Sequence, residues 1–305
     1  MDVSLAPRPV SRVAAPRTAL GTLRQILFYL LLTAFALAWM VPFIWMVSTA
    51  LKPEPEIYLF PPKLIPSTLV WANFVKAMKA AAFPIYFRNS LVQAVVHTVA
   101  SVFFGAMAGY AFARLKFRGH KPMFLLLLAK MMVPSQVTLI PLFLLCKNMP
   151  LFGGNDMLGH GGTGWLNSWW GLLVPGAISA YSIFMFRQFF QSLPRELEEA
   201  ARIDGASEWR IFWGIMLPQA TPAVATLSIF AFQSGWNSFL WPLVITTKDQ
   251  MRTIQIGLTV FRQDFNVQWA YLMAATTLAT IPMILIFLFG QRYFVKGITM
   301  TGMKG

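Results

Sequence analysis

Charged side chains are scarce in this chain, and acidic ones are scarcer than basic ones. Asp, Glu, Lys and Arg make up only 12% of the 305 residues, whereas 57% are apolar. An ordinary soluble domain carries about 25% charged residues. Because there are too few polar side chains to cover a globule, we expect much of the surface to face lipid.

Three further absences narrow the possible chemistry. The single cysteine, Cys146, lies in an apolar run, cannot form an intrachain disulfide and is expected to be a buried small hydrophobe. The histidines lack the spacing of metal ligands, so no metal site is predicted: they are His97, His120 and His160. The chain has no G-x-x-x-x-G-K-S/T phosphate-binding loop, and its apolar segments hold no paired carboxylates and no nucleophile with its base. We therefore predict that the chain is not an enzyme, has no catalytic residue and holds no cofactor of its own.

The apolar segments also contain no Asp or Glu. A secondary transporter driven by an ion gradient would need intramembrane carboxylates, so this alternative function is disfavoured. The net charge of +14 could indicate nucleic-acid binding. However, the basic residues lie between apolar segments and no recognition module is present, so nucleic acid is not an expected partner.

Six segments are apolar and long enough to cross a bilayer as helices, which takes about 20 residues. They span residues 26–48, 89–113, 122–146, 169–186, 218–245 and 267–291. The prolines in these segments are tolerable because neighbouring helices can satisfy the freed carbonyls. The first segment is too long for a signal peptide and lacks a cleavage site, so it is expected to be uncleaved. The sequence thus predicts an all-α membrane protein with a transmembrane domain at 26–291 and tails at 1–25 and 292–305.

Basic residues are unevenly divided between the two sides of these spans. Fifteen lie on the side of both chain ends: Arg8, Arg12, Arg17, Arg24, Arg114, Lys116, Arg118, Lys121, Arg187, Arg195, Arg202, Arg210, Arg292, Lys296 and Lys304. Nine lie on the other side: Lys52, Lys63, Lys76, Lys79, Arg88, Lys147, Lys248, Arg252 and Arg262. Because cytoplasmic loops carry the excess of Lys and Arg, we expect both termini in the cytoplasm.

Residues 192–218, between the fourth and fifth spans, form a charged, helix-forming segment. Pro194 suits a first helical turn. Three carboxylates then favour the positive end of a helix dipole: Glu196, Glu198 and Glu199. The segment cannot lie within the hydrocarbon, so we expect it on the cytoplasmic face of the membrane.

Small residues and helix stops divide this segment into two helices. Ala200 and Ala201 leave a shallow helix surface that another body can approach. Gly205 is a natural helix stop, Ser207 can cap a second helix, and Pro218 marks the start of the fifth span. The pattern predicts a helix–turn–helix that either docks a soluble partner or serves as an interfacial anchor without one.

The same segment resembles the EAA motif of ABC importer permeases at every defined position. The matching residues are Glu199, Ala200, Ala201, Gly205, Ile215, Leu217 and Pro218. In that family the segment is a coupling helix that sits in a groove of the ATP-binding subunit. The resemblance implies the same ATPase-coupling role here, and Asp204 beside Gly205 is included in the expected contact.

Three other stretches extend the resemblance to carbohydrate-type permeases, namely residues 60–62, 236–243 and 297–305. Six spans with this tail look like the maltose-type importer subunit whose C-terminus reaches into the ATPase dimer. By that likeness, four tail residues are expected to contact the ATPase: Thr301, Gly302, Lys304 and Gly305. The resemblance covers nearly the whole chain and departs at the longer glycine-rich loop 151–166 and at Lys130.

The family resemblance implies a type I ABC importer permease fold, a location in the bacterial inner membrane and a set of partners. These are a second, different permease, two ATP-binding subunits that hold ATP and Mg, an extracellular or periplasmic solute-binding protein, and membrane lipid. The expected cargo is a sugar or a related polyhydroxylated solute, and an ABC permease for glycerol phosphate is the alternative.

Four residues are candidates for the substrate path. Trp236, Asn237 and Trp241 offer an amide and aromatic faces that suit a polyhydroxylated solute, although packing at a helix break near Pro242 is an alternative. Lys130 is a charge inside the third span, which costs about 2.5–3.5 kcal/mol at a helix centre by insertion scales. It either lines the path, pairs with a carboxylate of a partner subunit, or extends its side chain to an interface.

A stripe of small residues in the second span predicts close helix packing. Gly105, Gly109 and Ala113 recur at four-residue spacing, which lets two helix backbones approach each other. The facing helix could belong to this chain or to the second permease.

Overall fold

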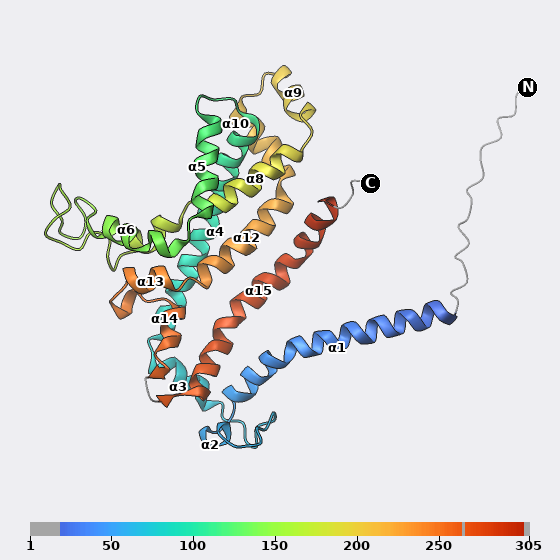
Figure 1. The fold of residues 1–305 in the computed structure, drawn as a ribbon, viewed down its shortest axis with the longest axis vertical. Coiled ribbons are helices and arrows are strands. Elements are labelled where there is room, and N and C mark those ends of the chain that lie inside the picture. Colours follow the sequence, from blue (N-terminus) through green and yellow to red (C-terminus); the bar gives the residue numbers. More distant parts are fainter. Residues whose placement is uncertain (1–18, 264–265, 302–305) are drawn as a thin grey trace, which may run out of the picture.

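The structure is a computed structural model that describes residues 19–263 and 266–301 (Figure 1). Three of the expected tail contacts, Gly302, Lys304 and Gly305, lie outside the described residues, as does most of the predicted N-terminal tail. Thr301 is the last residue of the final helix.

Helices make up nearly all of the described chain. The α-helices are α1 Ala19–Ala50, α2 Glu54–Ile57, α3 Ala72–Ala80, α4 Phe83–Arg114, α5 His120–Met132, α6 Ser135–Lys147, α7 Trp169–Leu173, α8 Ala180–Ser192, α9 Glu196–Ile203, α10 Glu208–Ile211, α11 Leu217–Gln219, α12 Thr221–Trp236, α13 Leu240–Ile245, α14 Ile254–Thr259 and α15 Trp269–Thr301. Short 3-10 turns occur at η1 Val174–Gly176 and η3 Asp249–Met251, and η2 Phe212–Met216 is a π-helix. A two-residue antiparallel pair, β1 Arg262–Gln263 and β2 Asn266–Val267, precedes α15.

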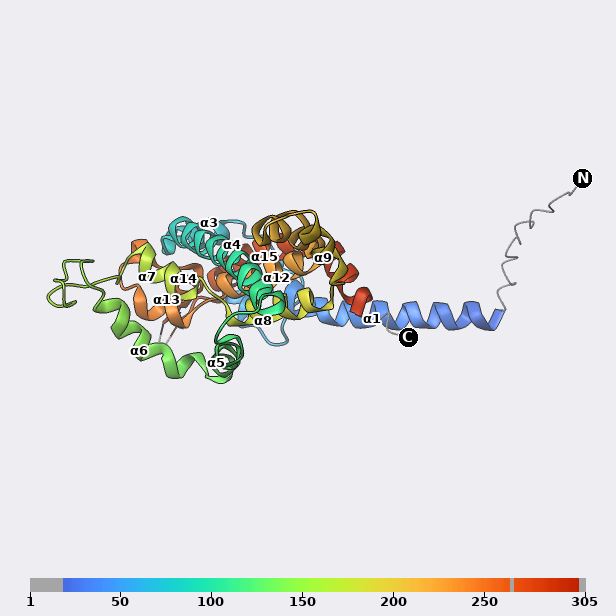
Figure 2. The same cartoon turned by 90° about the horizontal axis from the view of Figure 1, so that it is seen from above.

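The body of the molecule is built around α4, which packs against α8 and α12 (Figure 2). One core cluster lies among α3, α4, α12 and α15, and includes Phe83 and Trp236. A second lies where α4 and α8 meet the α9–α12 region, and includes Phe186, Phe190 and Phe212. The two clusters join segments far apart in the sequence into one helical bundle.

Glycines let α4 and α8 approach closely. A Cβ added to Gly105 would lie 2.8 Å from Cβ of Ser182, and one added to Gly109 would lie 2.6 Å from Cβ of Phe186. Ala113, one turn further on, is half-buried at the edge of the same cluster. The facing helix of this small-residue stripe is therefore α8 of the same chain, so the stripe is not free for the second permease.

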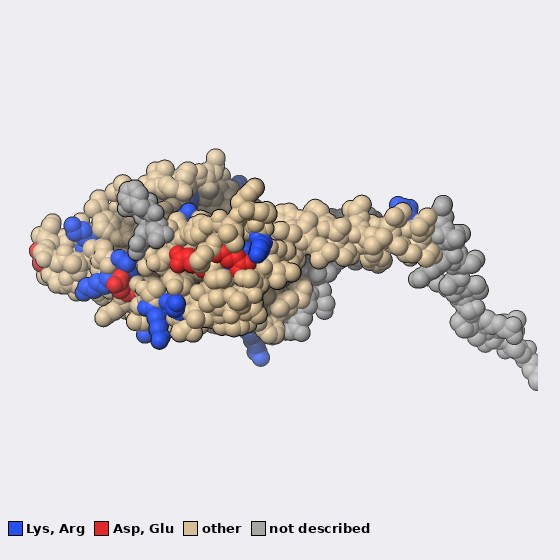
Figure 3. Space-filling model, turned by 90° about the horizontal axis from the view of Figure 1, so that it is seen from below, with Lys and Arg blue, Asp and Glu red and all other residues tan. Residues whose placement is uncertain are grey.

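Helix α1 projects from the body as a long arm (Figures 1 and 3). The most hydrophobic part of its apolar stretch Gly21–Ala50 has no residue buried within this chain. The helix contacts α15 near the body. Figure 3 shows that the arm is free of charge along nearly its whole length, whereas charged side chains gather on the body. Such a surface suits lipid or another apolar helix rather than water.

Four helices are long and apolar enough to cross a membrane: Gly21–Ala50, Phe83–Arg114, Trp169–Ser192 and Trp269–Gln291. Two further pairs of helices are long and apolar enough only when each pair is counted as one bent span. They are His120–Met132 with Ser135–Lys147 and Glu208–Gln219 with Thr221–Trp236. The described chain thus has four to six candidate spans.

The third predicted span is not one continuous helix. It bends by 106° between α5 and α6, at Val133 and Pro134. Val133 has φ −81° and ψ 119°, the extended backbone that a following proline favours, and Pro134 lacks the N–H that a helix would need. The prediction that one continuous helix would tolerate the prolines of this segment is wrong for Pro134.

The fifth predicted span is also divided. Its main helix begins at Thr221, after a 77° bend, and ends at Trp236. A separate helix, α13, then carries Pro242, whose ring cannot donate the backbone hydrogen bond that a continuous helix would require. The segment predicted at 218–245 therefore divides into a helix of 16 residues, a break and the short helix α13.

Candidate functional site

The charged segment 192–218 folds as two helices joined by a tight turn. Helix α9 ends at Ile203, and Gly205 adopts φ +79°, a left-handed conformation that costs other residues energy. The N–H of Ala206 donates to the carbonyl of Ala201 at 2.9 Å, and the N–H of Gly205 donates to that of Arg202 at 3.0 Å. These two bonds form a Schellman motif, so Gly205 ends α9 for the reason that the sequence predicted.

The second helix of the segment starts at a capping residue. The N–H of Arg210 donates to Oγ of Ser207, which precedes α10. The chain then passes through the π-helix η2 and α11, and turns at Ala220 into α12. Predicted residues Ile215 and Leu217 are half-buried against the second core cluster, whereas Pro218 is exposed.

Helix α9 presents an exposed face. The predicted residues on it are Glu199, Ala200 and Asp204, with Ile203 86% exposed beside them. Ala201 faces inward and is buried in the second core cluster. An exposed isoleucine among small and acidic residues offers a shallow, partly apolar surface for another protein.

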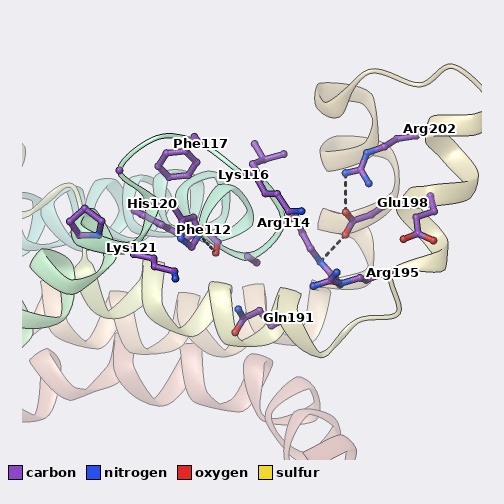
Figure 4. Close-up of a pocket in the computed structure, with 15 residues that line it drawn as sticks. Phe112, Arg114, Lys116, Phe117, His120, Lys121, Gln191, Arg195, Glu198 and Arg202 are labelled. Atoms are coloured by element: carbon purple, nitrogen blue, oxygen red, sulfur yellow. Dashed lines mark hydrogen bonds and ion pairs between the residues drawn. The ribbon is translucent and has the colours of Figure 1, made fainter.

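A network of ion pairs fastens α9 to the rest of the bundle (Figure 4). Nε of Arg114, the last residue of α4, lies 2.8 Å from Oε1 of Glu198, and the two side chains are only 4% and 3% exposed. The guanidinium also donates to the carbonyls of Phe190 and Leu193 at the end of α8. One buried charge pair therefore joins α4, α8 and α9.

The network continues to the partly exposed start of α10. Nη2 of Arg202 lies 3.2 Å from Oε2 of Glu198, and its Nε lies 2.7 Å from Oε1 of Glu208. The hydroxyl of Tyr110 donates to Oε2 of Glu208 at 2.9 Å. Hydrogen bonding to the Glu208 carboxylate raises the pKa of Arg202 above its ordinary value, so this guanidinium stays charged. Glu198 was expected only to favour the start of a helix, and its pairing with Arg114 was not predicted.

A cavity of about 540 Å³ lies among α4, α6, η1, α12 and α13. Its polar lining consists of neutral side chains: Gln93, His97, Ser135, Thr138, Ser234, Asn237 and Ser238. Leu172, Phe239 and Trp241 contribute apolar surface. Among the described residues that line this cavity, none is Asp, Glu, Lys or Arg.

Two residues of this lining come from the buried face of α4. Oε1 of Gln93 is buried without a hydrogen-bond partner in the described part of the chain. Nδ1 of His97 pairs with the carbonyl of Gly176 at 2.8 Å. Both were missed from the sequence, where His97 was considered only as a metal ligand, although two polar residues four apart in an apolar span are a usable signal.

The four residues predicted to line the substrate path are not placed together. Asn237 and Trp241 line the cavity, and Asn237 accepts a hydrogen bond from Gln255 at 3.3 Å. Nε1 of Trp241 donates to the carbonyl of Gly171 at 2.9 Å. Lys130 is exposed in the last turn of α5 and is not among the lining residues.

Trp236 is a core residue rather than a lining residue. It is 1% exposed, its Nε1 donates to the carbonyl of Ala279 at 3.0 Å, and its ring stacks on Phe232 and meets Phe87 edge-on. The prediction that its ring faces a solute is wrong in this structure, because α4, α12 and α15 enclose the side chain.

The arrangement of helices defines the class of the protein. A bacterial ABC transporter that imports the acidic polysaccharide alginate contains a chain of the same fold, with a TM-score of 0.75, 24% identity, and coverage of 92% of this chain and 100% of that one. A chain from an alginate ABC transporter solved with its pentasaccharide-bound periplasmic protein matches at a TM-score of 0.61 and 14% identity, over 90% of this chain and 96% of that one. The fold is that of an ABC importer permease.

Sequence similarity then places the chain in a family. Residues 101–300 match the model of the binding-protein-dependent transport system inner membrane component, and the chain belongs to this family. An arabinooligosaccharide transport permease of Halalkalibacterium halodurans is 34% identical over 92% of this chain and 98% of its own length. A lactose transport permease of Rhizobium radiobacter is 30% identical, over 90% and 95%. An sn-glycerol-3-phosphate transport permease of Yersinia enterocolitica is 33% identical, over 80% and 85%.

Proposed function

We propose that this chain is a transmembrane subunit of an ATP-driven importer and forms half of the path for a sugar or a related polyhydroxylated solute. The observation that carries the proposal is the helix–turn–helix of α9 and α10, whose small-residue face is exposed while the buried Arg114–Glu198 pair fastens it to the bundle. A docking element that transmits force needs both an exposed face and a stiff attachment.

In the proposed complex, α9 acts as the coupling helix and sits on a separate ATP-binding subunit. Two such subunits bind ATP and Mg, and this chain hydrolyses nothing itself. When ATP closes the dimer of these subunits, α9 moves with it and carries the attached ends of α4 and α8. The predicted contacts of Glu199, Ala200, Asp204 and Gly205 belong to this docking surface.

The proposed topology has six spans, with α5 and α6 counted as one and the segment 218–245 as the fifth, and both termini in the cytoplasm. The transmembrane domain covers residues 26–291, and the C-terminal tail from 292 contacts the ATPase. The apolar arm α1 supports a second permease as a neighbour, because its surface is unburied within this chain. A solute-binding protein on the opposite side of the membrane completes the assembly.

The neutral cavity is the proposed contribution of this chain to solute binding. Amide, hydroxyl and imidazole groups beside Trp241 suit the hydroxyls and apolar faces of a sugar. A phosphate would enter without a cationic partner on this half of the path, and burying an unpaired charge costs several kcal/mol. The lining therefore favours a sugar over glycerol phosphate.

Co-purification of the nucleotide-binding subunit tests the coupling role. Glu199→Lys and Gly205→Asp should each weaken retention of the ATPase, by reversing a charge on the docking face and by straining the turn after α9. Glu54→Lys, the same charge reversal on exposed α2, serves as the control. Full ATPase retention and full transport in both test variants would overturn the proposal.

A separate assay tests the cavity. In the reconstituted complex, Asn237→Ala should reduce the stimulation of ATPase activity by sugar and leave basal activity and assembly intact. Thr68→Ala, which removes an exposed hydroxyl from the loop after α2, is the control for general effects. Sugar stimulation equal to that of the unaltered chain would remove Asn237 from the path.

A further inference from the structure

A second cavity, of about 700 Å³, lies beside α9 and is separate from the proposed path (Figure 4). It is enclosed by the end of α4, the loop that follows it, the start of α5, the end of α8 and α9. The transport function assigned to the neutral cavity does not use this space.

The charges around this second cavity do not balance. Arg114 and Arg202 are already paired with Glu198. Lys116, Lys121 and Arg195 also line the cavity, and in the described part of the chain none of their side chains has a hydrogen bond or an ion pair. The only other carboxylate of the lining is that of Glu199, so three free cations face one free anion.

Two of these cations lie next to the ends of apolar helices, where the hydrocarbon of a membrane gives way to its headgroups. Lys116 lies two residues beyond the end of α4, and Lys121 is the second residue of α5. Phe112, Phe117 and Pro122 supply apolar lining on the same cavity. Helix α5, all of whose residues are described, has none buried, so the cavity opens at the edge of the bundle.

We infer that this cavity binds the phosphate group of an anionic membrane phospholipid, held by Lys116, Lys121 and Arg195. Phosphate oxygens are the acceptors that such a group of ammonium and guanidinium donors fits, and basic pockets between helix ends are typical sites for anionic headgroups. Because Arg195 immediately precedes α9, a bound phosphate would join the α4–α5 loop to the proposed coupling helix. The inference needs only that the chain lies in a membrane, as its family does.

The experiment compares lipid retention between the unaltered full complex and its variants. Each complex is purified in nanodiscs that contain mainly phosphatidylcholine and a minor share of phosphatidylglycerol. Native mass spectrometry counts the phosphatidylglycerol that stays bound. Lys116→Gln with Lys121→Gln should weaken retention about twenty-five-fold, because each basic residue near an anionic surface contributes about five-fold. Lys116→Arg with Lys121→Arg should retain the lipid, which excludes misfolding as the cause.

Arg118→Gln with Lys79→Gln is the matched control, since it removes the same charge from exposed positions outside the cavity. Its retention should fall by no more than about five-fold. An equal loss in the control and the test variant would overturn the inference, as would no loss in either.

Two further arms distinguish other occupants. Inorganic phosphate and sodium chloride are compared at equal ionic strength, and phosphate should displace no more lipid than sodium chloride does. Displacement by phosphate alone would assign the cavity to a soluble anion instead. If the glutamine variant keeps its lipid but loses the nucleotide-binding subunit, these cations contact the ATPase and the lipid inference fails. Lipid retention is measured without transport, so failure of the proposed transport function would be seen separately.

Discussion

Breaking the buried pair between Arg114 and Glu198 should release α9 from the bundle. The pair is 2.8 Å apart with side chains 4% and 3% exposed. At a charge separation of about 4 Å and an effective dielectric constant of about 20, the attraction is about 4 kcal/mol. Glu198→Leu leaves the buried Arg114 guanidinium without its counter-charge, and such changes cost about 3–5 kcal/mol.

Hydrogen exchange of the α9 amides measures this cost. A loss of about 3 kcal/mol corresponds to exchange more than about 100-fold faster in Glu198→Leu. The double variant Arg114→Met with Glu198→Leu removes both charges and should exchange more slowly than Glu198→Leu alone, although the carbonyls of Phe190 and Leu193 lose their donor.

The matched control is Glu199→Leu, the neighbouring but exposed carboxylate of the same helix. Its effect should stay below about five-fold, because exposed charges near a helix start contribute about 1 kcal/mol or less. If Glu198→Leu and Glu199→Leu accelerate exchange equally, the buried pair does not hold α9 in place. The reasoning would also be wrong if the double variant Arg114→Met with Glu198→Leu exchanged faster than Glu198→Leu alone.

Three other predictions concern the turn after α9, the segment at residues 51–70 (called the cap below) and the third span. Gly205→Ala should destabilise the end of α9 by about 1 kcal/mol, seen as roughly five-fold faster exchange, because alanine resists the φ of +79°; unchanged exchange would refute the Schellman turn. Hydrogen bonds from the Ser67 hydroxyl and N–H hold the pKa of Glu56 below its ordinary 4.5. The cap at residues 51–70 should therefore be most protease-resistant above pH 4.5 and lose resistance as pH falls through the lowered pKa, and Ser67→Ala should weaken this dependence; a cap that grows more resistant in acid would contradict it. Lys130→Met should abolish transport with normal assembly if that side chain faces the path, whereas full transport would assign it to the interface.

The local features of the charged segment were predictable from the sequence. Gly205 and Ser207 act through hydrogen bonds to residues within five positions of themselves, so the chain needs no distant partner to specify the turn and the cap. The first, second, fourth and last apolar spans were likewise predicted, because length and hydrophobicity are properties of one segment.

The cavity and the bends were predicted less well. Proline marks where a helix can break, but whether neighbouring helices absorb the break depends on packing, and the 106° bend at Pro134 was not expected. Trp236 and Trp241 lie five residues apart near the same break, and only the surrounding helices decide that the first is enclosed and the second borders the cavity. The sequence indicates that an aromatic is present without indicating what covers it.

The sequence by itself therefore determined a helical membrane chain with a charged helix–turn–helix between its apolar segments, because periodicity, capping and charge act over a few residues. Only the tertiary structure decided that Glu198 meets Arg114, 84 positions earlier in the chain, and that Gly105 and Gly109 face α8. It likewise decided which polar side chains share a cavity. These outcomes depend on which helices pack together, since burial strengthens a charge pair and close approach selects glycine only where another element is present.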